Sequence, residues 1–312
     1  MMKKWMLFAV LSALLISLLS LTALAKESPL PLEGYKEITP VIEKGNKSEI
    51  DIANKDYGYV KVKINTSDKR YKLRIQQVDS AGKEIAKYEY DAVGNNTFAN
   101  FPLQMGDGNY IVSIWENTTD KKYSKIQQSS TIKVKYAVPN APYLVPIQIV
   151  DFSATSKAAK KAAELCKGKT TEIDKVNAIY TFVIGNIKYD ADFAKNVVSG
   201  KVAFHIPSAD KTLESSKGIC YDYSSLMAAM LRSQGIACKV IKGDVPVKGE
   251  AVYHAWSEVF IKDVGWVKVG GSFQFDGKNF SRMDATFSSS NGNGAHTSFI
   301  GDGSNYIKKM EY

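Results

Sequence analysis

Cysteine and histidine are scarce in this sequence, with three of each among 312 residues. Small secreted domains held together by disulfides use more cysteines than this, so a disulfide framework is excluded. The odd count leaves at least one thiol unpaired within the chain. No group of histidine, cysteine and acidic residues has the spacing of metal ligands, so a metal hydrolase is not expected and no cofactor is predicted.

Clustered positive charge is also missing. The 41 lysines and arginines outnumber the 32 acidic residues, but they are scattered along the chain and form no basic block. Nucleic acid is therefore not expected as a partner. A moderately basic exported protein would be held near anionic surfaces, so an anionic polymer of the cell envelope is a candidate partner.

A long apolar run occurs at the start of the chain. Lys3 and Lys4 precede an uncharged stretch over residues 5–25, which ends Ala-Leu-Ala before Lys26. This pattern is typical of a signal peptide, so residues 1–25 are predicted to be removed during export. No cysteine lies near the cleavage site, which excludes a lipoprotein anchor, while an uncleaved membrane anchor stays open. We expect a secreted, extracellular protein with no membrane contact after cleavage.

Residues 35–137 have the pattern of antiparallel β-structure. Apolar and polar residues alternate over 57–64, and similar runs follow at 71–78, 110–115 and 131–136. Segments rich in Gly, Asn, Asp and Ser separate these runs. Short strands at such spacing predict an immunoglobulin-like β-sandwich. This segment contains no histidine or cysteine, so we expect it to be a binding or spacer module.

Prolines then mark an aperiodic stretch, interpreted as a linker to a second domain at residues 138–312. Helical periodicity follows over 156–166 and 171–184. An α+β fold is therefore predicted, with helices after the sandwich.

Cys220 begins a further helical pattern. Tyr223, Leu226 and Met230 fall on one face of this helix, and Gly235 ends it. The amides and dipole at a helix N-terminus stabilise a thiolate and lower the pKa of a thiol. Cys220 is therefore a candidate nucleophile, and a buried structural cysteine is the alternative. Of the other two cysteines, we expect either a disulfide or two buried thiols.

A thiolate nucleophile needs a base, and His254 is the candidate. His254 lies in an alternating strand pattern, on one face with Trp256. His205 and His296 lie in loop-like sequence and are expected to be solvated. A hydrogen-bonded structural histidine is the alternative for His254.

The base in turn needs an acceptor that fixes its tautomer. Asp284 lies in a strand pattern after a turn predicted at Asp276 and Gly277. From a strand beside that of His254, Asp284 could accept a hydrogen bond from the second ring nitrogen. An ordinary surface aspartate is the alternative.

Four ordered motifs resemble the core of the transglutaminase-like superfamily: Gly-Ile-Cys-Tyr-Asp-Tyr, Met-Leu-Arg-Ser-Gln-Gly-Ile, His-Ala-Trp-Ser-Glu-Val and Asp-Ala-Thr-Phe. The resemblance covers roughly residues 140–312. It implies a papain-like fold in which Cys220 is the nucleophile, His254 the base and Asp284 the orienting acid.

Two features depart from the family pattern. Gly270 stands where most members carry the acid after a Gly-Trp strand. Asp284 fits only if a hairpin is inserted between the histidine and aspartate strands. In addition, no tryptophan upstream of Cys220 matches the oxyanion residue of animal transglutaminases, and their calcium-binding segments are not recognisable.

The resemblance implies an exported cysteine-dependent amide hydrolase or peptidase, which acts on protein or peptide substrates through a thioester acyl-enzyme. With a lysine amine in place of water, the same chemistry gives a protein-crosslinking acyltransferase. The third alternative is a catalytically silent protein that binds the envelope. The alignment that places Gly270 at the position of the family's acid favours this alternative, because the base would then lack its orienting acid.

Overall fold

The computed structural model describes residues 38–66, 69–202, 204–247, 250–269, 274–275, 280–281 and 306–312. The predicted signal peptide, the predicted turn at Asp276 and Gly277, Asp284 and His296 lie outside the described residues. Within the described parts of the chain, no helix is long and apolar enough to cross a bilayer.

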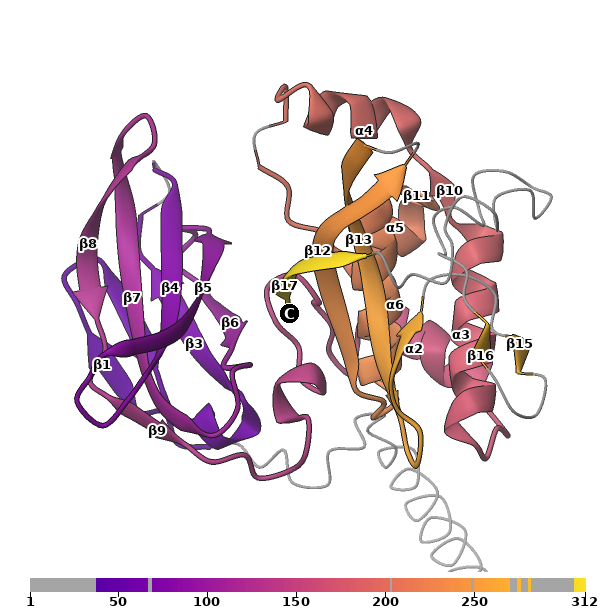
Figure 1. Cartoon of the computed structure of the whole chain (residues 1–312), viewed down its shortest axis with the longest axis horizontal. Helices are drawn as coiled ribbons and strands as arrows, with labels where there is room; N and C mark the ends of the chain where they lie inside the picture. The colour runs from indigo at the N-terminus through magenta and orange to yellow at the C-terminus, as the bar shows by residue number, and fades with distance from the viewer. Residues whose placement is uncertain are drawn as a thin grey trace, which may run out of the picture.

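Two antiparallel sheets form the N-terminal half (Figure 1). The first has the order β1-β2-β3-β6, made of Ile42–Lys44, Ser48–Asp51, Tyr59–Ile64 and Phe98–Pro102. The second has the order β5-β4-β7-β8, made of Glu84–Ala92, Tyr71–Val78, Gly108–Thr119 and Lys122–Gln128, and β9 (Ile132–Val134) pairs with β7. The antiparallel β-structure expected from the alternating sequence is confirmed.

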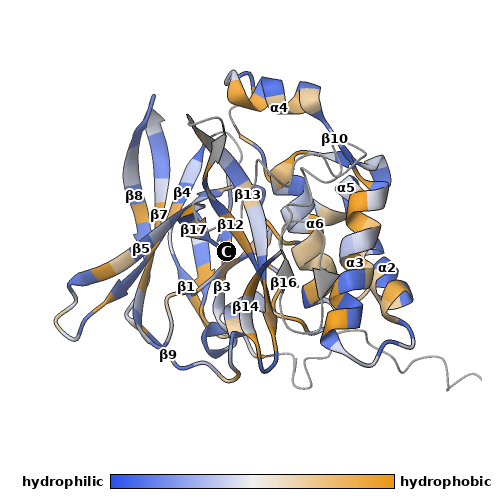
Figure 2. Ribbon diagram, turned by 45° about the vertical axis from the view of Figure 1, so that its right-hand side comes forward, coloured by the Kyte–Doolittle hydropathy of each residue, from blue (hydrophilic) through white to orange (hydrophobic). Residues whose placement is uncertain are grey.

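The core of this half follows from period-two alternation. In Figure 2, hydrophobic and hydrophilic residues alternate along the strands. Alternate residues of β3, and of β4 as far as Ile75, are buried in one apolar cluster that includes Val60, Val62, Leu73 and Ile75. A short 3-10 helix, η1 (Lys55–Tyr57), precedes β3.

The proline-containing stretch after β9 is buried, which its composition did not indicate. It contains the 3-10 helix η2 (Ala141–Tyr143), and Val145, Ile147 and Val150 lie in the same apolar cluster as both halves of the chain. Asn100 of the first sheet donates from its side-chain amide to the Pro146 carbonyl. The stretch is thus packed between the halves, because its apolar residues outweigh the lack of regular structure.

In the C-terminal half, helices cover one side of a third antiparallel sheet (Figure 1). The helices are α2 (Lys157–Cys166), α3 (Glu172–Asn186), α4 (Ala191–Val198), α5 (Ala209–Ser215) and α6 (Cys220–Arg232). The sheet has the order β14-β13-β12-β17, made of Gly265–Val269, Glu250–Ile261, Cys238–Val247 and Ile307–Glu311. Two short pairs are also described: β10 (Lys188–Tyr189) with β11 (Lys217–Gly218), and β15 (Gln274–Phe275) with β16 (Phe280–Ser281).

Side-chain caps explain where the first two helices begin. Ser156 accepts a hydrogen bond from the Ala159 amide, and Thr171 accepts one from the Asp174 amide. The α2 and α3 predictions are therefore confirmed, although α3 continues past its predicted end to Asn186.

The end of α6 is fixed by Arg232, which is fully buried. Its guanidinium donates to the carbonyls of Cys238, Val145 and Tyr312 at 2.9, 2.8 and 2.9 Å. Burial lowers the pKa of Arg232 to about 10. One side chain thus ties together α6, β12, the proline-containing stretch and the residue after β17.

The residues at the end of β17 also contact the sandwich. The Tyr312 and Tyr90 rings meet edge to face at 5.4 Å, and the Gln104 amide donates to the Glu311 carbonyl at 3.0 Å. The Tyr143 hydroxyl of η2 donates to the Glu311 carboxylate. Packed side chains and hydrogen bonds of Glu311 and Tyr312 therefore join the two halves at the end of β17.

Candidate active site

Cys220 is the first residue of α6, as the sequence predicted. The helix lies in the centre of the C-terminal half, and its residues are buried along its whole length. Cys220 is 9% exposed, at the end of the helix where backbone amides point outward. The sulfur therefore lies at the positive end of the helix dipole, beside amides that have no partner within the helix.

Asp222 shapes the start of α6. Its carboxylate accepts a hydrogen bond from the Ile219 amide at 2.9 Å, which caps the helix immediately before Cys220. Gly218 lies against this carboxylate, because a Cβ on residue 218 would sit 2.6 Å from the Asp222 Cβ. Asp222 and Gly218 together fix the backbone that carries the nucleophile.

His205 is the second partner of Asp222. The His205 Nε2 lies 2.7 Å from the second carboxylate oxygen, and Asp222 is 3% exposed. The ring also packs edge to face on Phe193 at 4.9 Å. The expectation that His205 is solvated is therefore wrong: the loop before α5 folds back over the start of α6.

The three cysteines are all free thiols. Burial raises the pKa of Cys238 to about 12, and it also raises the pKa of Cys166. Both are therefore held as neutral thiols near neutral pH. The choice left open by the sequence resolves to two buried thiols, and Cys220 is the remaining candidate nucleophile.

His254 lies in β13 and is 5% exposed. Its strand neighbours show which face it occupies: Ala255 and Val259 pack in the core with α6, whereas Trp256 lies in a separate cluster with Tyr306. His254 shares the Trp256 face by alternation, and its ring is 6.5 Å from that of Tyr306. The grouping of His254 with Trp256 agrees with the sequence pattern. It places His254 on the face of β13 opposite to the residues that pack with α6, so the described contacts do not join its ring to Cys220. The roles of His254 and Asp284 stay predictions.

Two residues that the sequence reasoning did not select lie near Cys220. Burial raises the pKa of Tyr253, and a negative charge on Cys220 raises it further. Burial lowers the pKa of Lys242 to about 8, and the charges of Asp91 and Cys220 offset part of that shift. Tyr253 and Lys242 face the start of α6 from β13 and β12.

Of the residues that surround the start of α6, some could have been identified from the sequence and others could not. Asp222 stands at the third position of the predicted helix, where a carboxylate commonly caps the N-terminus, so its role could have been found. Lys242 lies in a strand with unremarkable alternation. Asp91 lies more than a hundred residues before Cys220, and only the folded chain brings it near.

Gly218→Ala is expected to lower the free energy of unfolding by about 1–3 kcal/mol, because the added methyl group overlaps Asp222. Alkylation of Cys220 should also slow, since the helix start has to shift. Urea denaturation and iodoacetamide kinetics measure the two effects. Gly185→Ala is the matched control: a Cβ there meets nothing within 4 Å, so a gain of up to about 1 kcal/mol is expected. Equal behaviour of the two variants would contradict the tight fit at residue 218.

Residues 159–270 match the Transglut_core family, described as the transglutaminase-like superfamily. The curated UPF0252 protein MJ1282 of Methanocaldococcus jannaschii is 27% identical over 219 residues, a match that covers 67% of this chain and 58% of that protein. The match thus spans less than two thirds of that relative.

Two solved structures also resemble the chain. A protein from Cytophaga hutchinsonii, described as a candidate cysteine protease, has a TM-score of 0.40 and 13% identity, and covers 88% of this chain and 84% of its own. Red sea bream transglutaminase has a TM-score of 0.23 and 12% identity, with 72% and 49% covered.

The family match includes α6 and β13, which carry Cys220 and His254. Residues 159–270 are therefore a transglutaminase-like core. The predicted α+β fold class, with antiparallel sheets ahead of such a core, is confirmed. The match likewise supports the expected enzyme class, a transglutaminase-like cysteine hydrolase or acyltransferase.

Proposed function

We propose that this protein is an exported cysteine-dependent amide hydrolase or peptidase that acts on protein or peptide substrates. The observation that carries the proposal is the position of Cys220, a free thiol at the capped start of α6 within the transglutaminase-like core. Export is proposed from the basic and apolar sequence of residues 1–25, and an anionic envelope polymer is proposed as a secondary partner.

The chemistry has two steps. The Cys220 thiolate attacks the carbonyl carbon of an amide, and the Cys220 backbone amide is positioned to donate to the developing oxyanion. The C–N bond then breaks, and the leaving amine takes the proton held by the protonated base, which leaves a thioester on Cys220. In the second step, water attacks the thioester and gives up a proton to the base, which frees the carboxylic acid and restores the thiol.

His254 is proposed as the base and Asp284 as the residue that orients it, on the family resemblance. The His205–Asp222 pair places a histidine directly at the start of α6, at a position that the sequence did not indicate. His205 is proposed as a positioning residue, because its Nε2 is engaged by the carboxylate that caps α6.

The test offers glutamine- and lysine-containing peptides to the mature protein, with and without a primary amine, and follows the products by mass spectrometry. Hydrolysis or deamidation is expected to dominate. His254→Ala should remove the acyl-enzyme seen on the intact protein and lower kcat/KM by at least about a hundredfold. His205→Ala is the comparison variant, and its loss should be the smaller of the two.

Three outcomes would change the proposal. Amine incorporation that outcompetes hydrolysis would favour the crosslinking acyltransferase. A larger loss for His205→Ala than for His254→Ala would move the base to residue 205. Failure of every peptide to acylate Cys220 would favour the silent envelope-binding protein.

A further inference from the structure

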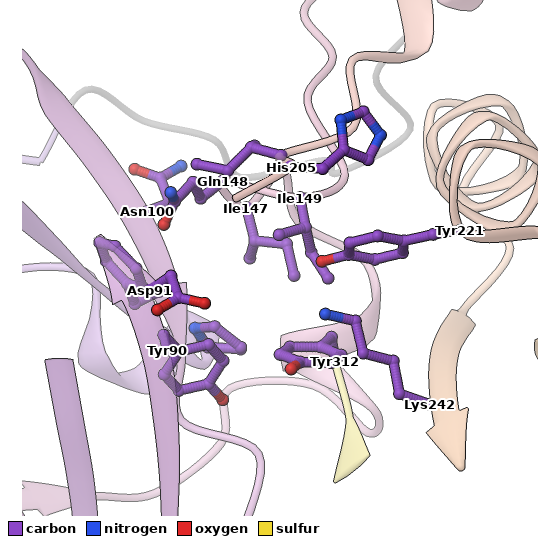
Figure 3. A pocket seen from close by; sticks show the side chains of 13 residues that line it. Tyr90, Asp91, Asn100, Ile147, Gln148, Ile149, His205, Tyr221, Lys242 and Tyr312 are labelled. Atoms are coloured by element: carbon purple, nitrogen blue, oxygen red, sulfur yellow. The ribbon is translucent and has the colours of Figure 1, made fainter. Parts of the chain in front are cut away.

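A cavity lies between the sandwich and the transglutaminase-like core, beside the start of α6. Its volume is about 30 Å³, it is partly open to solvent, and its walls come from both halves of the chain. In Figure 3, Asp91 and Asn100 line it from the sandwich, while Tyr221 and Lys242 line it from the core. Tyr221 directly follows Cys220 in α6, and the charge of Cys220 acts on Lys242, so the cavity lies near the proposed nucleophile although Cys220 does not line it.

The Lys242 amine points into this cavity (Figure 3). Its nitrogen is 3.8 Å from the centre of the Tyr221 ring and 5.0 Å from that of Tyr312. Within the described parts of the chain, no carboxylate lies within 4.0 Å of it. The rings of Tyr221 and Tyr312 therefore stabilise the Lys242 ammonium group, whose N–H donors can still bind a ligand.

Neutral donors lie on the same walls. The Gln148 side chain lines the cavity, and its buried amide nitrogen has no hydrogen-bond partner. The Tyr221 hydroxyl also points into the space (Figure 3). Leaving a buried donor such as the Gln148 amide unpaired costs free energy, so the cavity suits a ligand that brings acceptor oxygens.

The opposite wall does not cancel the positive charge. Asp91 is the acidic residue of the lining, and its carboxylate is taken by Lys72 of the neighbouring strand at 2.5 Å. Among the described residues no carboxylate pairs directly with Lys242, and Asp91 acts on its charge only at longer range. A single negative group with two acceptor oxygens would satisfy both the amine and the neutral donors.

We propose that this cavity binds a carboxylate of the peptide substrate, with Lys242 as the cation and the Gln148 amide and Tyr221 hydroxyl as further donors. The carboxylate comes from the C-terminus of the peptide or from an acidic side chain close to the amide under attack. The link to turnover rests on the proposed function, whereas the binding itself can be measured without turnover.

The test measures binding to the Cys220→Ala protein by fluorescence polarisation, with a mixed-sequence pool of labelled hexapeptides. The pool is made with a C-terminal carboxylate or carboxamide, and with internal glutamate or glutamine, so that the two sources are separated. One acid form is expected to bind at least about tenfold more tightly than its amide partner, as suits a charge-assisted hydrogen bond.

Lys242→Met in the same background should remove this preference, and Lys242→Arg should keep most of it because it retains the cation. Lys83→Met, at an exposed position in the sandwich, should bind as its parent does. Thermal unfolding of each variant shows that it is folded.

Equal binding of acid and amide forms, including no binding of either, would overturn the proposal. So would a Lys242→Met variant that keeps the preference and, with Cys220 restored, only slows alkylation of Cys220, because Lys242 would then serve the thiolate alone. If the acid forms bind but the wild-type protein never turns them over, the carboxylate site stands and the proposed function fails. If the wild-type protein turns peptides over but shows no preference for the acid forms, the proposed function stands and the carboxylate site fails.

Discussion

Cys220→Ala is expected to abolish turnover, with kcat/KM lower by about 10⁴-fold or more. The reason is that the reaction passes through a bond to this sulfur, and no second thiol can replace it. Cys166 and Cys238 are buried, and burial raises the pKa of each. Peptide hydrolysis followed by mass spectrometry measures the loss, and the thioester on the intact protein should vanish with it.

The matched control is Cys166→Ser, which removes a buried thiol at the end of α2 and should leave turnover in place. Iodoacetamide should label one thiol quickly in the wild-type protein, and none in Cys220→Ala. The enzyme interpretation fails if Cys220 labels no faster than a free thiol near neutral pH. It also fails if the alanine variant hydrolyses peptides as the wild type does.

Arg232→Met is expected to produce the largest loss of stability, about 3–5 kcal/mol in the free energy of unfolding. The methionine fills much of the volume but leaves three buried carbonyls, of Val145, Cys238 and Tyr312, without their donor. Urea denaturation followed by circular dichroism measures the change.

Arg70→Met is the control for this second prediction. Arg70 is exposed, and its contact with the Asp120 carbonyl is long, at 3.4 Å. A change within about 0.5 kcal/mol is therefore expected. Similar losses in the two variants would show that the buried guanidinium does not hold the C-terminal half together.

The regular elements could be predicted because their burial follows local periodicity. The α6 helix begins at Cys220, as the amphipathic pattern indicated, and β4 spans Tyr71–Val78 as the alternation did. The stretch around Pro142 was misjudged for a physical reason. Its burial depends on apolar surface supplied by both halves of the chain, which local composition does not encode.

The same distinction applies to the candidate site. Cys220 could be found from its place at a helix start, since that environment is local. The pairing of His205 with Asp222, and the placing of Lys242 over Tyr221, depend on tertiary contacts between elements far apart in sequence. Such contacts have no periodic signature, so these partners could be identified only in the folded chain.

The burial of the segment between η2 and α2 restricts how the two halves can move. Val145, Ile147 and Val150 are wedged in a shared apolar interior, so a rocking motion that opened this seam would expose them to water at a cost of about 1.5–3 kcal/mol per side chain. The contact between the two halves is therefore rigid and does not act as a hinge. For the peptide substrates proposed above, access to the cavity between the halves would then depend on side-chain movement and not on separation of the halves.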